Sequence, residues 1–204
     1  MARKHQQYIR PDQPQVFLPF QHPRLVAKPP QGGPWIHEIK FDGYRVQIHV
    51  RAGAATIFTR NGHDWTRKFP ELAQDLAELP NCILDGELCA IDAAGHPDFS
   101  SLRASISPGE TGRLVVFVFD VLWGKGEDMR PYSWEGRQHV LEQILGVSQS
   151  ERIRDVESFD LPGLSLWASA CKMDLEGIVS KRTDAPYSGG RRGDTWVKSK
   201  CRPS

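Results

Sequence analysis

A single lysine, Lys40, stands where its type and its neighbours would allow covalent chemistry. It follows an apolar run over residues 35–39 that is typical of a strand, and a turn-forming Asp42-Gly43 pair and then Arg45 come after it. In water only about four lysines in ten thousand are neutral and nucleophilic at pH 7, but partial burial and a nearby cation both lower a lysine pKa. Lys40 is therefore a candidate nucleophile. On this stretch alone, a solvated lysine at the edge of a hairpin is an equally good interpretation.

Other segments of the chain decide between these two interpretations. They follow Lys40 in order at residues 59–62 (TRNG), 84–88 (LDGEL), 117–122 (FVFDVL), 176–182 (EGIVSKR) and 196–200 (WVKSK). Together with residues 40–45 (KFDGYR), this series resembles the motifs of covalent nucleotidyltransferases, the superfamily of ATP-dependent DNA ligases, RNA ligases and mRNA capping enzymes. The residues around Lys40 and Glu176 are most similar to the ligase domain of bacterial nonhomologous end-joining DNA ligases.

The resemblance implies a fold and a division of the chain. We expect an α+β fold of antiparallel sheets with flanking helices, the covalent nucleotidyltransferase (ATP-grasp-like) fold, with residues 16–204 as one adenylation domain. Residues 1–15 are polar and are expected to form a mobile basic arm. No C-terminal oligonucleotide-binding barrel, which family ligases carry, follows residue 200 in this sequence. Whether the chain is a natural minimum, a fragment or a subunit completed by another protein stays open.

The resemblance also implies roles for the residues nearest the reacting phosphate. Lys40 would attack the α-phosphate of ATP and carry AMP as a phosphoramidate. Glu87 and Glu176 would hold or orient Mg²⁺ or Mn²⁺, since magnesium favours one or two carboxylates together with waters and substrate phosphates. Lys198 and Lys200 would contact the α-phosphate. Two positions apart on a strand share a face, so these two lysines can reach one phosphate, although paired lysines on a strand edge also serve to block aggregation.

The remaining candidates would bind the rest of the nucleotide and the DNA. Arg45 and Arg60 match residues that contact the nucleotide ribose and the DNA 5′-phosphate, for which arginine offers bidentate donors. Phe119 would stack on adenine, and Glu38 would read the adenine amino group. The alternative for Phe119 is a place in the core, where phenylalanines of an apolar strand usually lie.

Periodicity and breakers predict the elements that position these residues. Strands are expected at 35–39, 44–50 (half-buried), 56–59, 82–91, 114–122 (central), 178–179 and 195–200, and helices at 70–79, 98–106 and from Ser133 to near Gly146. A further helix is expected after Pro162, with Leu164, Trp167, Ala168 and Cys171 facing inward.

Composition bounds the class of protein. With 204 residues, 39% hydrophobic residues and a net charge of +1, the chain can form one good core, and its basic residues gather toward the two ends. The cysteines Cys82, Cys89, Cys171 and Cys201 have no paired spacing, so the sequence indicates neither a zinc site nor a disulfide framework. The sequence has no apolar run of membrane-span length and no signal core, which predicts no membrane association and a cytoplasmic location, near the nucleoid when on DNA.

The resulting hypothesis is an ATP-dependent DNA ligase catalytic domain that seals nicked double-stranded DNA in repair or recombination. A separate DNA-binding or end-joining protein would be a partner that supplies the barrel. Two alternatives stay open: a degenerate module that binds DNA ends without sealing them, and an RNA ligase or capping-type nucleotidyltransferase.

Overall fold

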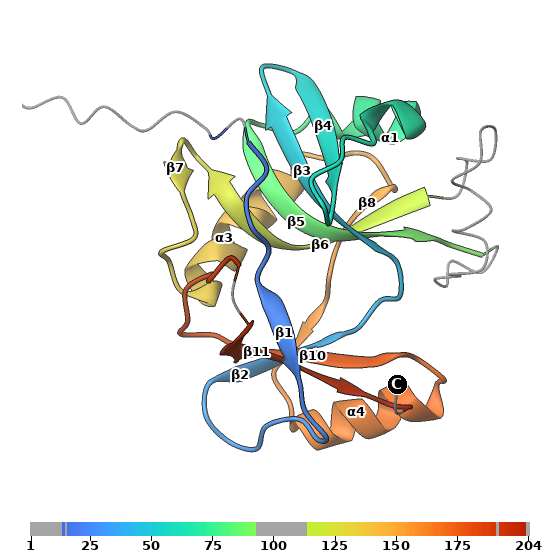
Figure 1. The fold of residues 1–204 in the computed structure, drawn as a ribbon, viewed down its shortest axis with the longest axis vertical. Coiled ribbons are helices and arrows are strands. Elements are labelled where there is room, and N and C mark those ends of the chain that lie inside the picture. The colour runs from blue at the N-terminus through green and yellow to red at the C-terminus, as the bar shows by residue number, and fades with distance from the viewer. Residues whose placement is uncertain (1–13, 15, 93–113, 191, 203–204) are drawn as a thin grey trace, which may run out of the picture.

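Two β-sheets form the frame of the molecule, and the computed structural model describes it over residues 14, 16–92, 114–190 and 192–202. Residues 1–13 and 15 of the predicted arm lie outside these ranges. The helix predicted at 98–106 also lies outside them. The six-stranded sheet has the order β4-β3-β5-β6-β7, with β8 paired to β6, and the five-stranded sheet has the order β1-β11-β10-β2-β9. Figure 1 shows the six-stranded sheet above the five-stranded one.

The strands of the six-stranded sheet are β3 (Tyr44–Arg51), β4 (Ala54–Thr59), β5 (Cys82–Ala90), β6 (Leu114–Gly124), β7 (Glu127–Asp128) and β8 (Ile153–Asp155). Those of the five-stranded sheet are β1 (His22–Leu25), β2 (Trp35–Ile39), β9 (Ser158–Phe159), β10 (Gly177–Arg182) and β11 (Arg192–Lys200). The helices are α1 (Pro70–Leu76), α3 (Trp134–Leu145), α4 (Gly163–Lys172) and the short 3-10 turn η1 (Thr66–Lys68). The predicted α+β class with flanking helices is confirmed, and most strand pairs are antiparallel. Two pairs are parallel instead, β1 with β11 and β6 with β8.

The main core lies between the six-stranded sheet and the helices α1 and α3. It is made of branched aliphatic residues such as Ile48, Leu84 and Leu141, all fully buried. Burial of such side chains stabilises the sheet by roughly 1.5–3 kcal/mol each. Ser133 caps α3 as predicted, because its hydroxyl accepts from the backbone of Gly136. This core holds β5 and β6, which carry several candidate site residues, in a fixed register.

The strand predicted over 44–50 is present as β3, but the prediction that its polar face is exposed is wrong. Gln47 and His49 are buried together with the apolar residues between them. The N-terminal segment covers them: the Gln47 amide exchanges two hydrogen bonds with the backbone of Leu18, and His49 contacts the Gln47 oxygen at 2.8 Å. Burial lowers the pKa of His49 to about 4, so this buried imidazole stays uncharged near neutral pH.

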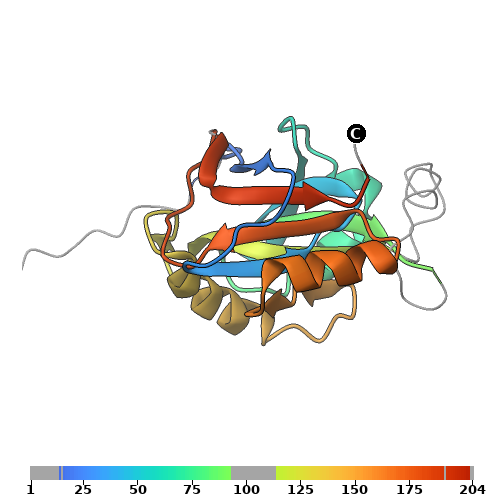
Figure 2. The ribbon, with the colours of Figure 1, turned by 90° about the horizontal axis from the view of Figure 1, so that it is seen from below.

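Helix α4 also differs from its prediction. It packs on β10 and β2 beneath the five-stranded sheet, and Figure 2 shows it alongside these strands. Its buried residues are Gly163 and Ala170, whereas Leu164 and Ala168 are exposed. The small residues let the helix approach the sheet closely, since a Cβ on Gly163 would lie 2.6 Å from the His37 ring. The predicted inward positions are therefore wrong for Leu164 and Ala168, whereas Trp167 and Cys171 are partly buried.

A disulfide joins Cys171, near the end of α4, to Cys201, directly after β11. The cysteine spacing had indicated no disulfide framework, so this bond corrects that interpretation. The two residues are 30 positions apart in sequence, a separation that has no recognisable spacing pattern, and only the packing of α4 against the five-stranded sheet brings them together.

Candidate active site

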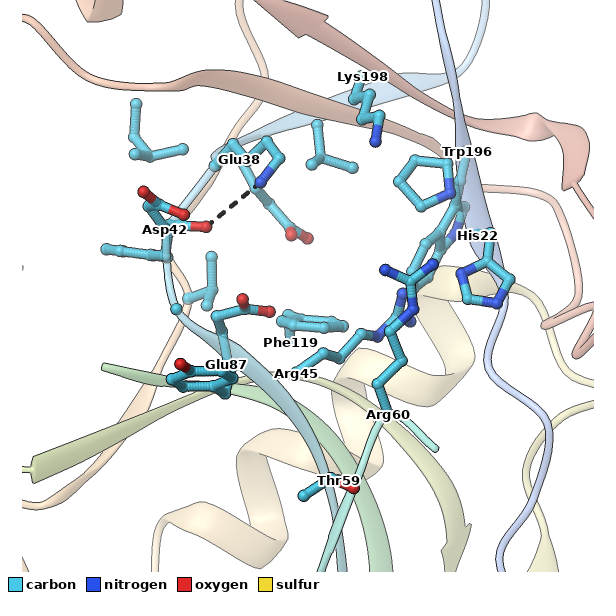
Figure 3. Close-up of a pocket in the computed structure, with 18 of the residues that line it drawn as sticks. His22, Glu38, Asp42, Arg45, Thr59, Arg60, Glu87, Phe119, Trp196 and Lys198 are labelled. Carbon is cyan, nitrogen blue, oxygen red and sulfur yellow. Dashed lines mark hydrogen bonds between the residues drawn. The ribbon is translucent and has the colours of Figure 1, made fainter. Parts of the chain in front are cut away.

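A cavity of about 560 Å³ lies between the two sheets, and most of the predicted site residues line it. These lining residues are Glu38, Lys40, Arg45, Arg60, Glu87, Phe119 and Lys198. Figure 3 shows Glu38 and Lys198 on the side of the five-stranded sheet and Glu87, Phe119 and Arg45 on the other. Such a volume is typical of sites for small molecules and cofactors. Segments far apart in the sequence therefore meet around one space.

Lys40 follows β2 directly and enters the cavity from there. Its Nζ donates to Glu176 Oε2 at 2.5 Å and to the backbone oxygen of Phe41 at 3.4 Å. Lys200 reaches the other oxygen of the same carboxylate, with Nζ 3.5 Å from Glu176 Oε1. Glu176 and Lys200 do not line the cavity themselves. Glu176 contacts the lining residue Lys40, and Lys200 contacts Glu176. The carboxylate of Glu176 thus lies between two lysines.

Two glycines allow this close arrangement of backbone around Lys40. Gly177, next to Glu176, has a φ of 147°, and a Cβ there would lie 2.1 Å from the backbone oxygen of Ser199. A Cβ on Gly43 would lie 2.4 Å from the backbone oxygen of Leu88. A side chain at Gly177 would push β10 away from β11, and a side chain at Gly43 would push the segment after Lys40 away from β5.

Glu38 is buried at the floor of the cavity and pairs with Lys181, whose Nζ is 2.7 Å from Glu38 Oε2. Burial raises the pKa of Glu38 to about 7, although the attraction of Lys181 partly offsets this. Lys181 also donates to the backbone oxygen of Phe119 at 3.1 Å and lies over the Phe119 and Trp196 rings. The sequence analysis did not select Lys181 as a site residue, even though it belongs to the segment 176–182.

Arg45 is held by a bidentate ion pair with the buried Asp85, with N–O distances of 2.9 and 2.6 Å. Tyr187 donates a further hydrogen bond to the same carboxylate at 2.7 Å. Burial would lower the pKa of Arg45, but the charge of Asp85 more than offsets this and raises it. The guanidinium lies 5.4 Å from the centre of the Phe119 ring. Arg45 therefore presents a permanent, fixed cation to the cavity.

Glu87 pairs across the sheet with Arg45, and its side chain enters the cavity. Burial raises the pKa of Glu87 to about 7, while the charges of Lys40 and Arg45 partly offset the shift. A carboxylate that is costly to ionise beside two cations gains from a further cation close to it. No cluster of three or more histidine, cysteine, aspartate or glutamate side chains that could hold a metal occurs among the described residues. A divalent ion would therefore need oxygen ligands from substrate and water beside Glu87 and Glu176.

Phe117 and Phe119 have different surroundings, although both lie on β6. Phe117 is buried and stacks on Phe41 with ring centres 4.0 Å apart. Phe119 lies where the register between β5 and β6 shifts, opposite the step from Asp85 to Gly86, and its partly buried ring lines the cavity. The shift is a β-bulge, which re-aims a side chain. The structure thus presents Phe119, and not Phe117, to the cavity.

Several lining residues were not selected from the sequence. Polar and aromatic examples are His22, Asn61, His63, Trp65, Lys181 and Trp196. His22 comes from β1, whose parallel pairing with β11 no local pattern indicates. Asn61 and Trp196 lie inside the quoted segments, so attention to every polar or aromatic position of these segments would have found them.

Comparisons with known proteins identify the family of the chain. Residues 17–200 match the family model described as ATP dependent DNA ligase domain. The chain is 38% identical over 179 residues to the multifunctional non-homologous end joining protein LigD of Pseudomonas aeruginosa, covering 87% of this chain and 21% of that protein. It is 34% identical over 173 residues to a probable DNA ligase of Beutenbergia cavernae, covering 81% and 33%. The chain thus spans between a fifth and a third of these two relatives.

A solved structure gives the same answer for the fold. The mycobacterial DNA ligase D complexed with ATP and MES superposes with a TM-score of 0.71 at 29% identity, covering 87% of this chain and 60% of that one. No helix of the described residues is long and apolar enough to cross a membrane. The match over residues 17–200, with the motif series inside it, shows that this chain belongs to the ATP-dependent DNA ligase domain family.

Proposed function

We propose that this chain is the adenylation core of a ligase that joins DNA ends or nicks. Lys40 takes AMP from ATP, AMP passes to the 5′-phosphate of the DNA, and the 3′-hydroxyl then displaces it to form the phosphodiester bond. The observation that carries the proposal is the position of Lys40 Nζ in a cavity lined by Arg45, Arg60 and Lys198. These cations suit the phosphates of a nucleotide and of a DNA end.

In the first step the Lys40 amine forms a bond to the α-phosphorus, and the bond from that phosphorus to pyrophosphate breaks. An ammonium has no free lone pair, so Lys40 must first lose a proton. Glu176 Oε2 lies 2.5 Å from Nζ and would accept that proton. Lys198 and Lys200 stabilise the negative charge on the α-phosphate, and in-line geometry depends on these contacts rather than on further covalent chemistry.

The base end of the nucleotide would lie against Phe119, beside Glu38. The ring of Phe119 offers an apolar face, and an ionised Glu38 accepts a hydrogen bond from the adenine amino group. Arg45, fixed by Asp85, would contact the ribose, and Arg60, which is exposed at the end of β4, would contact the DNA 5′-phosphate.

Mg²⁺ or Mn²⁺ fits the two carboxylates Glu87 and Glu176 together with phosphate oxygens and waters. A bound divalent cation would supply charge neutralisation on the phosphates. Glu176 is shared between the two tasks, so the ion pair with Lys40 is exchanged when nucleotide and metal enter. The raised pKa of Glu87 favours a site that is completed by a cation.

The biological setting we propose follows from this chemistry. The relatives' names include non-homologous end joining, so we infer a role in DNA repair, and in recombination where ends are exchanged. Nicked double-stranded DNA is the proposed substrate, with a DNA-binding or end-joining protein as partner. A protein that joins chromosomal ends would work in the bacterial cytoplasm, close to the nucleoid.

Two nicked duplexes test the proposal directly. One carries an ordinary 5′-phosphate and is given ATP with magnesium or manganese; the other already carries AMP on its 5′-phosphate and is given no ATP. The wild type should seal both, Lys40→Ala only the second, and Glu87→Ala neither. Sealing of the first nick by Lys40→Ala would contradict the proposal. Binding of nicked DNA at low salt without sealing of either substrate would favour a module that only binds ends.

A further inference from the structure

The disulfide between Cys171 and Cys201 lies next to the residues that contact Lys40. Its Cα atoms are 5.1 Å apart, within the range that a disulfide spans without backbone movement. The backbone N–H of Cys201 donates to the oxygen of Glu176 at 3.0 Å. The preceding residue, Lys200, receives a hydrogen bond on its backbone oxygen from Trp167 of α4 at 3.3 Å. One covalent link therefore holds the backbone at Glu176 and Lys200 against α4.

The loop that this link closes contains much of the proposed phosphate chemistry. Residues 172–200 include β10, β11 and the side chains of Glu176, Lys181, Lys198 and Lys200. Glu176 in turn is bonded to Lys40 at 2.5 Å. Opening the disulfide would free one end of β11 and leave Glu176 and Lys200 positioned only by noncovalent contacts. A redox change at the surface thus has a short path to the nucleophile.

The other two cysteines differ in their surroundings. Cys82 and Cys89 are buried and are not part of the disulfide. Burial raises the pKa of Cys82 to about 12 and raises that of Cys89 as well, so neither forms a reactive thiolate near neutral pH. Cys171 and Cys201 are only partly buried, which leaves them within reach of small thiols and disulfides. Thiol chemistry is thereby confined to the pair beside Glu176.

We propose that Cys171 and Cys201 form a reversible thiol–disulfide site that controls the transfer of AMP from ATP to Lys40, called charging below. The reactant is a low-molecular-weight disulfide such as oxidised glutathione. One protein thiolate attacks it and releases one glutathione thiol; the second protein thiolate then displaces the other, so two thiols are oxidised and one disulfide is reduced. The oxidised form holds Glu176 and Lys200 in place and charges faster. This inference rests on the proposed function, since charging is the activity that it regulates.

Counting of free thiols is the first part of the test. The unfolded protein is alkylated before and after reduction and then digested. The inference predicts two modified cysteines, Cys82 and Cys89, after treatment with oxidised glutathione, and four after dithiothreitol. Four modified cysteines under both conditions would overturn it.

Charging by ATP is then measured in the oxidised and in the reduced protein, below the melting temperature of both. Reduction should lower kcat/KM for ATP at least fivefold. Cys171→Ser and Cys201→Ser should each have the kcat/KM of the reduced wild type, and this value should not change with the redox buffer. Cys82→Ala, which removes a thiol from the other sheet, should keep the redox response. Ser133→Ala destabilises α3 through its lost cap and should not change the rate of charging.

Hydrogen exchange makes the result independent of charging. Reduction should speed the exchange of backbone amides over residues 176–182 and 195–200, with little change in β3 and β5. Equal charging and equal exchange in both states would overturn the inference but leave the proposed function standing. Absence of charging in both states would count against the proposed function, while the exchange pattern would still decide whether the disulfide controls the backbone at Glu176.

Discussion

Two ion pairs of the molecule differ in their surroundings, one in the frame of sheets and helices and one in the site. Arg137 and Asp120 are both fully buried and are joined by two hydrogen bonds of 2.6 and 2.9 Å. Arg137 also donates hydrogen bonds to the backbone oxygens of Tyr132 and Ala185. Lys40 and Glu176 are joined by a single bond, and their side chains are 20% and 23% exposed. The first pair ties α3 to β6; the second lies at the cavity.

This difference corresponds to two tasks. The planar guanidinium fixes both direction and distance, whereas an ammonium on a flexible stem can exchange one oxygen partner for another. Phosphate or metal can therefore replace the partners of Lys40 without disturbing the frame. Arg45 combines both properties, because Asp85 fixes two of its nitrogens while the side chain still faces the cavity. The comparison predicts that the two regions respond to mutation in opposite ways.

The largest expected effect falls on the site. Glu87→Gln and Glu176→Gln should each lower the rate of charging at least a hundredfold, as the loss of a major charge-stabilising contact typically does. The melting temperature should barely change, because both side chains face the cavity or its edge. Rates from labelled ATP and melting curves would be compared with those of Glu151→Gln, which alters an exposed glutamate. Loss of stability with normal charging would assign these carboxylates to the frame.

The next effect falls on the frame. Arg137→Met leaves Asp120 buried without its cation, which should lower the free energy of unfolding by about 3–5 kcal/mol. Charging per folded molecule should stay near that of the wild type at low temperature. Urea unfolding measures the loss, and adding Asp120→Asn should recover part of it by removing the buried charge. If Arg137→Met is as stable as the wild type but does not form lysyl-AMP, the assignment of Arg137 to the frame would be wrong.

A pH titration sharpens the comparison. Burial raises the folded-state pKa of Glu38 and Glu87 from 4.5 to about 7, so between these values the folded protein binds more protons than the unfolded one. These two groups therefore make stability fall as pH rises from 4.5 to 7. Charging needs an ionised Glu87 and should rise roughly tenfold per unit up to pH 7. In Glu38→Gln, the free energy of unfolding, measured with urea at several pH values, should depend less on pH than in the wild type. A rate of charging that does not change from pH 5 to 8 would contradict this account.

The smallest effect is expected at the surface. Asp184 pairs with Arg182 at 2.6 Å, and both side chains are substantially exposed. Asp184→Asn should leave both the melting temperature and the rate of charging unchanged, since solvent screens such pairs. A clear loss of charging would mean that Arg182 must be held in place for the reaction.

The sequence predicted most of the strands because the alternation of apolar and polar residues is a local pattern. The motif resemblance selected Lys40 and Glu87, and both line the cavity. Lys181 was not selected, because a lysine in a basic segment is usually solvated and only the packing of β10 on β2 buries it against Glu38. The disulfide was missed for the same reason: its two cysteines approach each other only in the folded protein.

Incubation of the protein with α-labelled ATP and magnesium, followed by denaturing electrophoresis and peptide mapping, tests the central claim most directly. The account predicts one labelled peptide with AMP on Lys40, through a bond that is labile in acid and stable in alkali. The label should be absent from Lys40→Ala, whose melting temperature should match that of the wild type. Label on another residue, or label that persists in Lys40→Ala, would contradict the account.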